Sequence, residues 1–145
     1  VVREFSGVNV IERVHPSFGY GILSTTTVPH VVVLLNRNSA SASEILAGAL
    51  QDHGVAKIVG EKSFGKGSVQ TLVDIGEIGS IKITIARWFT PAGHTISGTG
   101  LTPDITVDMT KYASSSDAYI DAAIDTLKDP SQWPDTATST ASSTK

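Results

Sequence analysis

The sequence predicts an α/β fold, in which one strand–helix–strand crossover is joined to antiparallel strands in a mixed sheet. Residues 31–35 are a continuous run of valine and leucine, and residues 42–52 carry apolar side chains at helical spacing. Residues 69–74 and 80–89 instead alternate with a period of two, which is typical of antiparallel strands. These patterns together indicate both parallel and antiparallel pairing.

The crossover begins with the strand predicted at residues 31–35. A strand that is buried on both faces reads as a continuous apolar run, so we place a central parallel strand here. The helix predicted at residues 42–52 ends before Gly54, which supplies a C-terminal stop. A second strand at residues 56–59 completes a right-handed unit and leads into a glycine-containing loop, residues 60–68.

The rest of the chain is predicted to form a hairpin, a long loop and a closing helix. Residues 76–79 connect the two alternating strands, and a last short strand is expected at residues 105–107. Residues 116–128 again have apolar side chains at helical spacing, and serines at 114–116 are candidates for the helix cap. We therefore expect a second helix there.

The length suits a single domain with a tail. We expect residues 1–110 to form the body, residues 111–130 a closing helical segment and residues 131–145 a disordered tail. The serine, threonine and alanine residues of this tail have too little apolar surface to offset the entropy of ordering. The first residues are neither a start methionine nor a signal peptide, so we expect a fragment that is truncated at its N-terminus.

The composition excludes several classes of function. The net charge is −3, a balance that gives no electrostatic surface for nucleic acid. The absence of cysteine excludes a thiolate nucleophile, a disulfide framework and a thiolate metal site. The four histidines lack metal-ligand spacing, so neither a metal nor another cofactor is predicted.

Ser41 stands at the predicted start of the first helix. Unpaired backbone N–H groups and the helix dipole favour a developing oxyanion at such a place. If Ser41 attacks a carbonyl group, the N–H of Ala42 would point at the tetrahedral oxygen. Ser41 and Glu44 also have the spacing of a capping box, which is a commoner role for a serine at a helix start. The local sequence leaves both roles open.

Lys66 lies between two glycines in the loop that follows the second strand. A lysine acts as a base near pH 7 only where burial lowers its pKa from about 10.4. As a base, Lys66 would therefore lie in an apolar cleft, with Gln70 placed to hold its amine by a hydrogen bond. The alternative is an ordinary solvent-exposed lysine in a glycine loop.

Two other kinds of site compete for the same residues. Residues 60–66 match the beginning of the phosphate-binding pattern G-x-x-x-x-G-K-S/T, but Gly67 replaces its hydroxyl residue and a strand follows instead of a helix. A Ser-His-Asp triad would need His53 or His94 as its base. His53 lies at the far end of the helix that Ser41 opens, well over ~10 Å away at ~1.5 Å per residue.

Five segments taken together resemble the C-terminal processing (tail-specific) serine peptidases. The order and spacing of these segments carry the resemblance, which covers most of residues 31–108. The segments are residues 36–45 (NRNSASASEI), 47–54 (AGALQDHG), 60–70 (GEKSFGKGSVQ), 86–93 (ARWFTPAG) and 98–104 (GTGLTPD).

The resemblance implies a serine-type peptidase with a Ser-Lys dyad and no cofactor. The family's nucleophile falls on Ser41, the middle serine of an S-A-S-A-S run, and its base falls on Lys66. Its supporting glutamine falls on Gln70, and Ala42 supplies a backbone N–H to the oxyanion hole. His94 stands where many relatives have arginine.

The resemblance also implies a fold like that of the crotonase and Clp-peptidase group, with residues 1–110 as the C-terminal part of the catalytic domain. Substrates would be unfolded or C-terminally exposed proteins, cleaved through an acyl-enzyme on the periplasmic or cell-envelope side. A second oxyanion donor and a PDZ module are expected in the missing N-terminal part, so this fragment alone is expected to be inactive. A non-catalytic ligand- or peptide-binding module on the same fold is the alternative.

Overall fold

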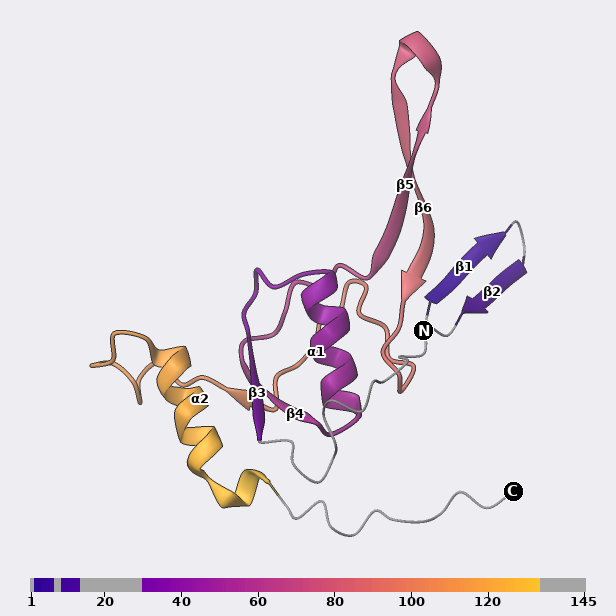
Figure 1. The fold of residues 1–145 in the computed structure, drawn as a ribbon. Coiled ribbons are helices and arrows are strands. Elements are labelled where there is room, and N and C mark those ends of the chain that lie inside the picture. Colours follow the sequence, from indigo (N-terminus) through magenta and orange to yellow (C-terminus); the bar gives the residue numbers. More distant parts are fainter. Residues whose placement is uncertain (1, 7–8, 14–29, 134–145) are drawn as a thin grey trace, which may run out of the picture.

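The computed structural model describes residues 2–6, 9–13 and 30–133, which form two small sheets and two helices (Figure 1). The elements in chain order are β1 (Val2–Ser6), β2 (Asn9–Arg13), β3 (Val31–Leu35), α1 (Ala42–Asp52), β4 (Ala56–Gly60), β5 (Ser68–Asp74), η1 (Gly76–Ile78), β6 (Ser80–Trp88), β7 (Ile105–Thr106), α2 (Ala118–Lys128) and η2 (Pro130–Gln132). The antiparallel sheet has the strand order β2-β1-β6-β5, and the parallel sheet has the order β3-β4-β7. The predicted single mixed sheet is therefore wrong for the described residues, because the sequence patterns indicate how strands pair but not which strands share a sheet.

The predicted crossover is present as β3, α1 and β4. Strands β3 and β4 pair in parallel, and β4 also pairs in parallel with β7. The predicted strand at residues 31–35 is confirmed, but its central position is wrong. Within the described residues β3 lies at an edge of its sheet, and Leu34 is 36% exposed. An apolar run indicates burial but does not identify the neighbouring strands, and β4 is the central one.

The core lies on both faces of this three-stranded sheet. Ile58 of β4 packs against Ala47 of α1, whereas the next residue, Val59, packs against Ala118 and Ala122 of α2. Successive side chains of a strand point to opposite faces, so the two helices cover the sheet from opposite sides. The bounds of α1 match the predicted helix at residues 42–52.

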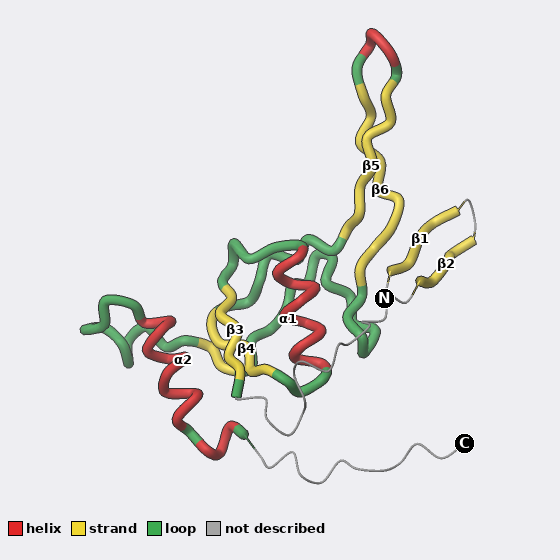
Figure 2. The backbone as a smooth tube through the Cα atoms, viewed as in Figure 1, coloured by secondary structure: helices red, strands yellow, loops and turns green. Residues whose placement is uncertain are grey.

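Strands β5 and β6 form the predicted antiparallel hairpin. The hairpin projects away from the helices and the parallel sheet (Figure 1, Figure 2), and η1 forms its tip. Along β6, the alternating residues Ile81, Ile83 and Ile85 are exposed. The period-two pattern thus predicts the strand correctly, while these isoleucines are not covered by the described part of the chain.

The second helix, α2, begins later than the predicted range of 116–128. Its N-cap is Asp117, whose side chain accepts hydrogen bonds from the N–H groups of Tyr119 and Ile120. After α2, the short helix η2 falls at the start of the predicted tail, and the Trp133 ring stacks on His30 with centroids 4.2 Å apart. The first residues of the predicted tail thus form part of η2, and residues 134–145 lie outside the described residues. Neither helix in the described ranges is long and apolar enough to cross a membrane.

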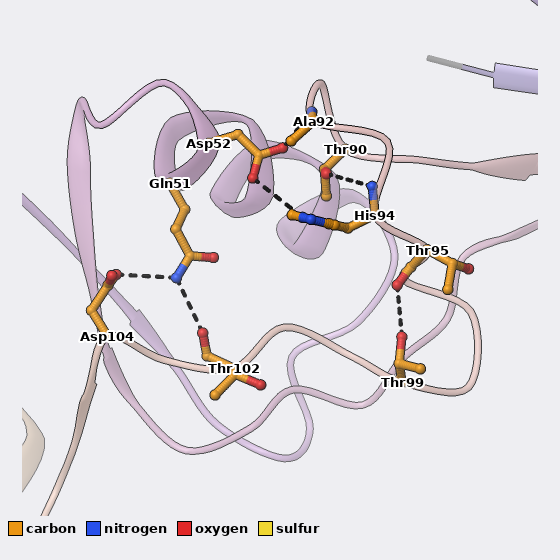
Figure 3. A network of polar contacts seen from close by, with 9 residues as sticks. All are labelled: Gln51, Asp52, Thr90, Ala92, His94, Thr95, Thr99, Thr102 and Asp104. Carbon is orange, nitrogen blue, oxygen red and sulfur yellow. Dashed lines mark hydrogen bonds and ion pairs between the residues drawn. The ribbon is translucent and has the colours of Figure 1, made fainter.

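A polar network holds the C-terminal end of α1 (Figure 3). The Gln51 side-chain amide donates to Thr102 O and to Asp104 Oδ2, each at 3.1 Å. The same Asp104 oxygen accepts the Ile58 N–H at 2.8 Å, and so links α1 to β4. These bonds fasten the end of α1 that is remote from Ser41.

A second polar cluster, Lys111, Tyr112 and Asp125, ties α2 to the segment before it. The Tyr112 hydroxyl donates to Asp125 Oδ2 at 2.7 Å, and Lys111 Nζ lies 3.0 Å from the same oxygen. The Tyr112 hydrogen bond, followed by that of Lys111, lowers the pKa of the Asp125 carboxyl group. The pKa of Lys111 is raised to about 12, first by the Tyr112 hydrogen bond and then by the Asp125 bond.

The lowered pKa of Asp125 predicts a pH dependence of stability. A carboxyl group with a lowered folded-state pKa stabilises the protein above its unfolded pKa of about 3.9, and this contribution is lost as the pH falls through the folded pKa. We expect Asp125→Asn to lose less stability than wild type between pH 6 and pH 3, as measured by urea midpoints. Asp121→Asn on the same helix is the control, and an Asp125→Asn protein with the wild-type pH dependence would contradict the prediction.

Candidate active site

Ser41 has an unusual backbone conformation at the start of α1. Its φ is 58° and its ψ is −113°, and it is the only non-glycine residue with positive φ in the described ranges. Such a conformation costs about 1–3 kcal/mol and is found mainly where function requires it. A sharp strained turn into a helix is also how nucleophilic serines are presented in other hydrolases.

The capping role of Ser41 is present as well. Ser41 and Glu44 form a capping box, in which the Ser41 N–H donates to Glu44 Oε2 at 2.8 Å. A capping serine needs no positive φ, since N-cap residues usually have extended backbone angles. Capping therefore does not account for the strain at Ser41.

The strain at Ser41 predicts an effect on stability. Glycine adopts positive φ without a steric cost, so Ser41→Gly should be more stable than Ser41→Ala by about 1 kcal/mol. Urea unfolding of the two variants measures this difference. Ser43→Gly is the matched control, because Ser43 lies inside α1, where glycine should destabilise by about 1 kcal/mol. Equal stabilities of the two Ser41 variants would contradict the assigned strain.

Ala42 is the first residue of α1 and is exposed. The first N–H groups of a helix have no partner within the helix. The Ala42 N–H therefore lies at the helix N-terminus beside Ser41, where a negatively charged oxygen would be stabilised. This is the place that the sequence predicts for an oxyanion donor.

Lys66 lies in the loop between β4 and β5, and its backbone is close to that of Ser41. The N–H groups of both residues donate to Glu44 Oε2, Ser41 at 2.8 Å and Lys66 at 2.9 Å. The side chain of Lys66 is exposed, which contradicts the expected burial in an apolar cleft. That expectation came from the requirements of a lysine base, and no described residue covers the side chain.

Gln70 lies in β5, four residues after Lys66, and its side chain is exposed. Its amide nitrogen donates to Thr84 Oγ1 across the hairpin at 3.4 Å. The hydrogen bond expected between Gln70 and the Lys66 amine is not formed in the described part of the chain. The structure thus brings Ser41, Ala42 and the Lys66 backbone together, and it leaves Gln70 on the hairpin.

Glu44 is a component of the site that the sequence analysis missed. Its side chain is 0% exposed, and its two oxygens accept four hydrogen bonds. Besides the Ser41 N–H, the donors come from the loop, namely Ser63 Oγ at 2.5 Å, Gly65 N at 2.7 Å and Lys66 N at 2.9 Å. The capping-box spacing indicated only the Ser41 bond. The other three partners depend on how the chain folds back on itself.

These contacts also argue against the phosphate-binding site that was the alternative for this loop. In such a site, the backbone N–H groups of the glycine-containing loop bind the phosphate. Here the N–H groups of Gly65 and Lys66 are already bonded to the Glu44 carboxylate. The loop continues into strand β5 and not into a helix. The loop binds an anion, but that anion is a side chain of the same protein.

The glycines of the loop are explained by a close approach of a second loop. A Cβ on Gly65 would lie 2.8 Å from Gly100 N, and one on Gly67 would lie 2.7 Å from Ser97 N. The Gly98 N–H also donates to Gly65 O at 2.9 Å. The Lys66 backbone is therefore fixed between Glu44 on α1 and the loop at residues 96–101.

Neither His53 nor His94 forms a triad with Ser41. His94 Nδ1 lies 3.8 Å from Asp52 Oδ1, at the C-terminal end of α1 (Figure 3). His53 is the C-cap of the same helix. Because α1 has 11 residues and a helix rises ~1.5 Å per residue, both histidines are remote from Ser41 at the other end. The described residues contain no cluster of three or more acidic or histidine side chains that could hold a metal ion.

Comparison with known proteins finds peptidases at the level of both the family and single relatives. The sequence profile of Peptidase family S41 matches residues 12–107. The chain is 58% identical over 79 residues to the carboxy-terminal-processing protease of Bartonella bacilliformis, covering 54% of this chain and 18% of that protein. It is 48% identical over 84 residues to a probable CtpA-like serine protease of Staphylococcus aureus, covering 58% of this chain and 17% of that protein.

Solved structures agree with this match. The photosystem II D1 C-terminal processing protease is 39% identical, with a TM-score of 0.54 over 71% of this chain and 26% of that protein. Mature CPAF, at 22% identity, has a TM-score of 0.55 over 70% of this chain and 20% of its own, which shows a shared fold. The chain thus spans less than a fifth of its curated relatives. It belongs to peptidase family S41, and its relatives there are carboxy-terminal-processing proteases.

Proposed function

We propose that this chain carries the dyad of a serine endopeptidase, with Ser41 as the nucleophile and Lys66 as the general base. One observation carries the proposal. Ser41 is held in a strained conformation at a helix N-terminus, and its N–H shares a carboxylate oxygen with the N–H of Lys66. A strained serine that opens a helix suits a nucleophile, which gains exposure and a nearby helix N–H from such a turn.

The proposed chemistry is acyl transfer. Lys66 Nζ takes the proton of Ser41 Oγ as this oxygen attacks the peptide carbonyl carbon, and the Ala42 N–H stabilises the resulting oxyanion. Lys66 then donates the proton to the leaving amine as the peptide bond breaks. Water, deprotonated in turn by Lys66, hydrolyses the acyl-enzyme and restores Ser41.

The exposed side chain of Lys66 places a condition on this mechanism. A lysine base must lose hydration to become neutral near pH 7. We propose that bound substrate, or residues of a longer protein, cover Lys66 in the working enzyme. Gln70 would then orient the amine after exchanging its long hydrogen bond to Thr84 for one to Lys66. We propose a crotonase/Clp-peptidase-like fold for the longer protein, with Lys66 covered in this way.

The proposed substrates are unfolded proteins or proteins with exposed C-termini, in keeping with the names of the relatives. The net charge of −3 gives no reason to expect nucleic acid as a partner. We propose a PDZ module and a second oxyanion donor elsewhere in a longer protein that works on the extracytoplasmic side. Residues 1–110 would then belong to its catalytic domain, and the isolated chain would be inactive.

The test compares two proteins with a substrate that ends in an unstructured tail. The full-length protein should cleave this substrate, and the isolated 145-residue chain should not. The loss of one oxyanion donor alone costs roughly 10² to 10³ in rate. Binding of the substrate without cleavage by the full-length protein would favour a ligand- or peptide-binding module and would contradict the proposal.

A further inference from the structure

Near the proposed dyad, Glu44 is the side chain that accepts the most hydrogen bonds. Its carboxylate is fully buried, and each oxygen accepts two hydrogen bonds. Oε1 accepts the Ser63 hydroxyl at 2.5 Å and the Gly65 N–H at 2.7 Å. Oε2 accepts the Ser41 N–H at 2.8 Å and the Lys66 N–H at 2.9 Å.

The burial of this carboxylate is costly unless all of its acceptor sites are used. An ionised carboxylate that leaves water without hydrogen-bond partners loses several kcal/mol. Four donors around the two oxygens compensate for this loss, and charge-assisted bonds of this kind are roughly twice as strong as neutral ones. The arrangement is therefore a rigid one, because movement of any donor would leave part of a buried charge unpaired.

The two oxygens of Glu44 accept hydrogen bonds from different parts of the chain. Oε1 joins α1 to Ser63, whose hydroxyl oxygen in turn accepts the Leu101 N–H at 2.7 Å. Oε2 instead joins the backbone of Ser41 to the backbone of Lys66. Bonds to a single oxygen atom keep these two N–H groups close together. The Gly65 N–H, bonded to Oε1, holds the same loop, so one carboxylate sets the position of the Lys66 loop relative to the helix start.

We propose that Glu44 is a positioning residue, which fixes nucleophile and base relative to each other by accepting the Ser41 and Lys66 N–H groups at one oxygen. The inference rests on the proposed dyad. Glu44 touches neither the substrate nor the reacting atoms, and it acts through the backbone of the two residues that do. Misplacement of a catalytic group by about 1 Å can cost roughly 10² in rate, which is the scale of effect expected here.

Two substitutions separate this role from a general effect on stability. Glu44→Met has a similar volume but no acceptor for the N–H groups, so kcat should fall roughly 10²-fold with little change in KM. Glu44→Gln retains one carbonyl oxygen. That oxygen should face Ser41 and Lys66, because the amide NH₂ then donates to the Ser63 hydroxyl and meets one backbone N–H, that of Gly65, whereas the opposite orientation would place it against two backbone N–H groups. Glu44→Gln should therefore keep most of the wild-type kcat.

Asp104→Ala is the matched control in the full-length protein. This carboxylate also accepts a backbone N–H, that of Ile58, but it lies at the other end of α1 (Figure 3). Its loss should lower the melting temperature and leave kcat nearly unchanged. A folded Glu44→Met protein with the wild-type kcat would overturn the proposal. A Glu44→Gln protein as impaired as Glu44→Met would also overturn it, since the bridging oxygen is still present.

A measurement on the wild type covers the case in which Glu44→Met does not fold. Amide protons of Ser41 and Lys66, observed in protein labelled with ¹⁵N-serine and ¹⁵N-lysine, should exchange slowly because both are bonded to a buried oxygen. Exchange at unprotected rates would overturn the proposal. This test needs no activity, and retained activity in Ser41→Ala or Lys66→Ala would instead refute the dyad itself.

Discussion

Ser41→Ala is expected to lower the kcat for peptide hydrolysis by roughly 10⁴-fold or more in the full-length protein. Without the hydroxyl group no acyl-enzyme can form, and the remaining rate would come from substrate binding and the oxyanion site. Alanine keeps the backbone conformation at position 41. The site should therefore bind substrate as before, and KM should change little. The measurement is steady-state cleavage of a substrate with an unstructured C-terminal tail.

Ser43→Ala is the matched control for this substitution. Ser43 lies two residues further along, and its hydroxyl donates to Ala40 O at 2.9 Å. It has no part in the proposed chemistry, so its removal should leave kcat close to that of wild type. If Ser41→Ala kept substantial activity while Ser43→Ala lost it, the nucleophile would be misassigned.

Lys66→Ala is expected to lower kcat by roughly 10³-fold, within the range that general acid–base catalysis contributes. Lys66→Arg sharpens the test, because arginine keeps the positive charge and much of the length but stays protonated. Both variants should lose activity to a similar extent if Lys66 accepts a proton. The measurement is again kcat on the tailed substrate.

Lys62→Ala provides the control for the lysine series. Lys62 is an exposed residue of the same loop and is not part of the proposed dyad. Its removal changes the net charge by the same amount as Lys66→Ala and should leave kcat nearly unchanged. An active Lys66→Arg enzyme would mean that Lys66 serves as a fixed charge and not as a base.

The elements of the crossover could be predicted because their signals are local. The spacing of apolar residues over residues 42–52 fixed the bounds of α1. The central position assigned to β3 could not be predicted reliably, since an apolar run does not say which strand lies beside it. The central strand is β4, and its residues Ile58 and Val59 face different helices.

Some features of the candidate site could likewise be predicted from the sequence, and others could not. The helix start at Ser41 and the glycine loop around Lys66 are visible as sequence patterns. The role of Glu44 is not, because its partners Ser63 and Gly65 lie about twenty residues away in the chain and meet it only in the folded protein. The exposure of Lys66 was also unpredictable, since its expected burial followed from the chemistry of a base and not from neighbouring residues.

The dyad is tested most directly by covalent labelling of the full-length protein with a fluorophosphonate, followed by peptide mapping. These reagents react with a serine hydroxyl that a base has activated. We predict one phosphonate adduct on Ser41 in wild type, a much slower reaction in Lys66→Ala and no adduct at this position in Ser41→Ala. An adduct on another serine, or labelling of Ser41 at an undiminished rate in Lys66→Ala, would contradict the account.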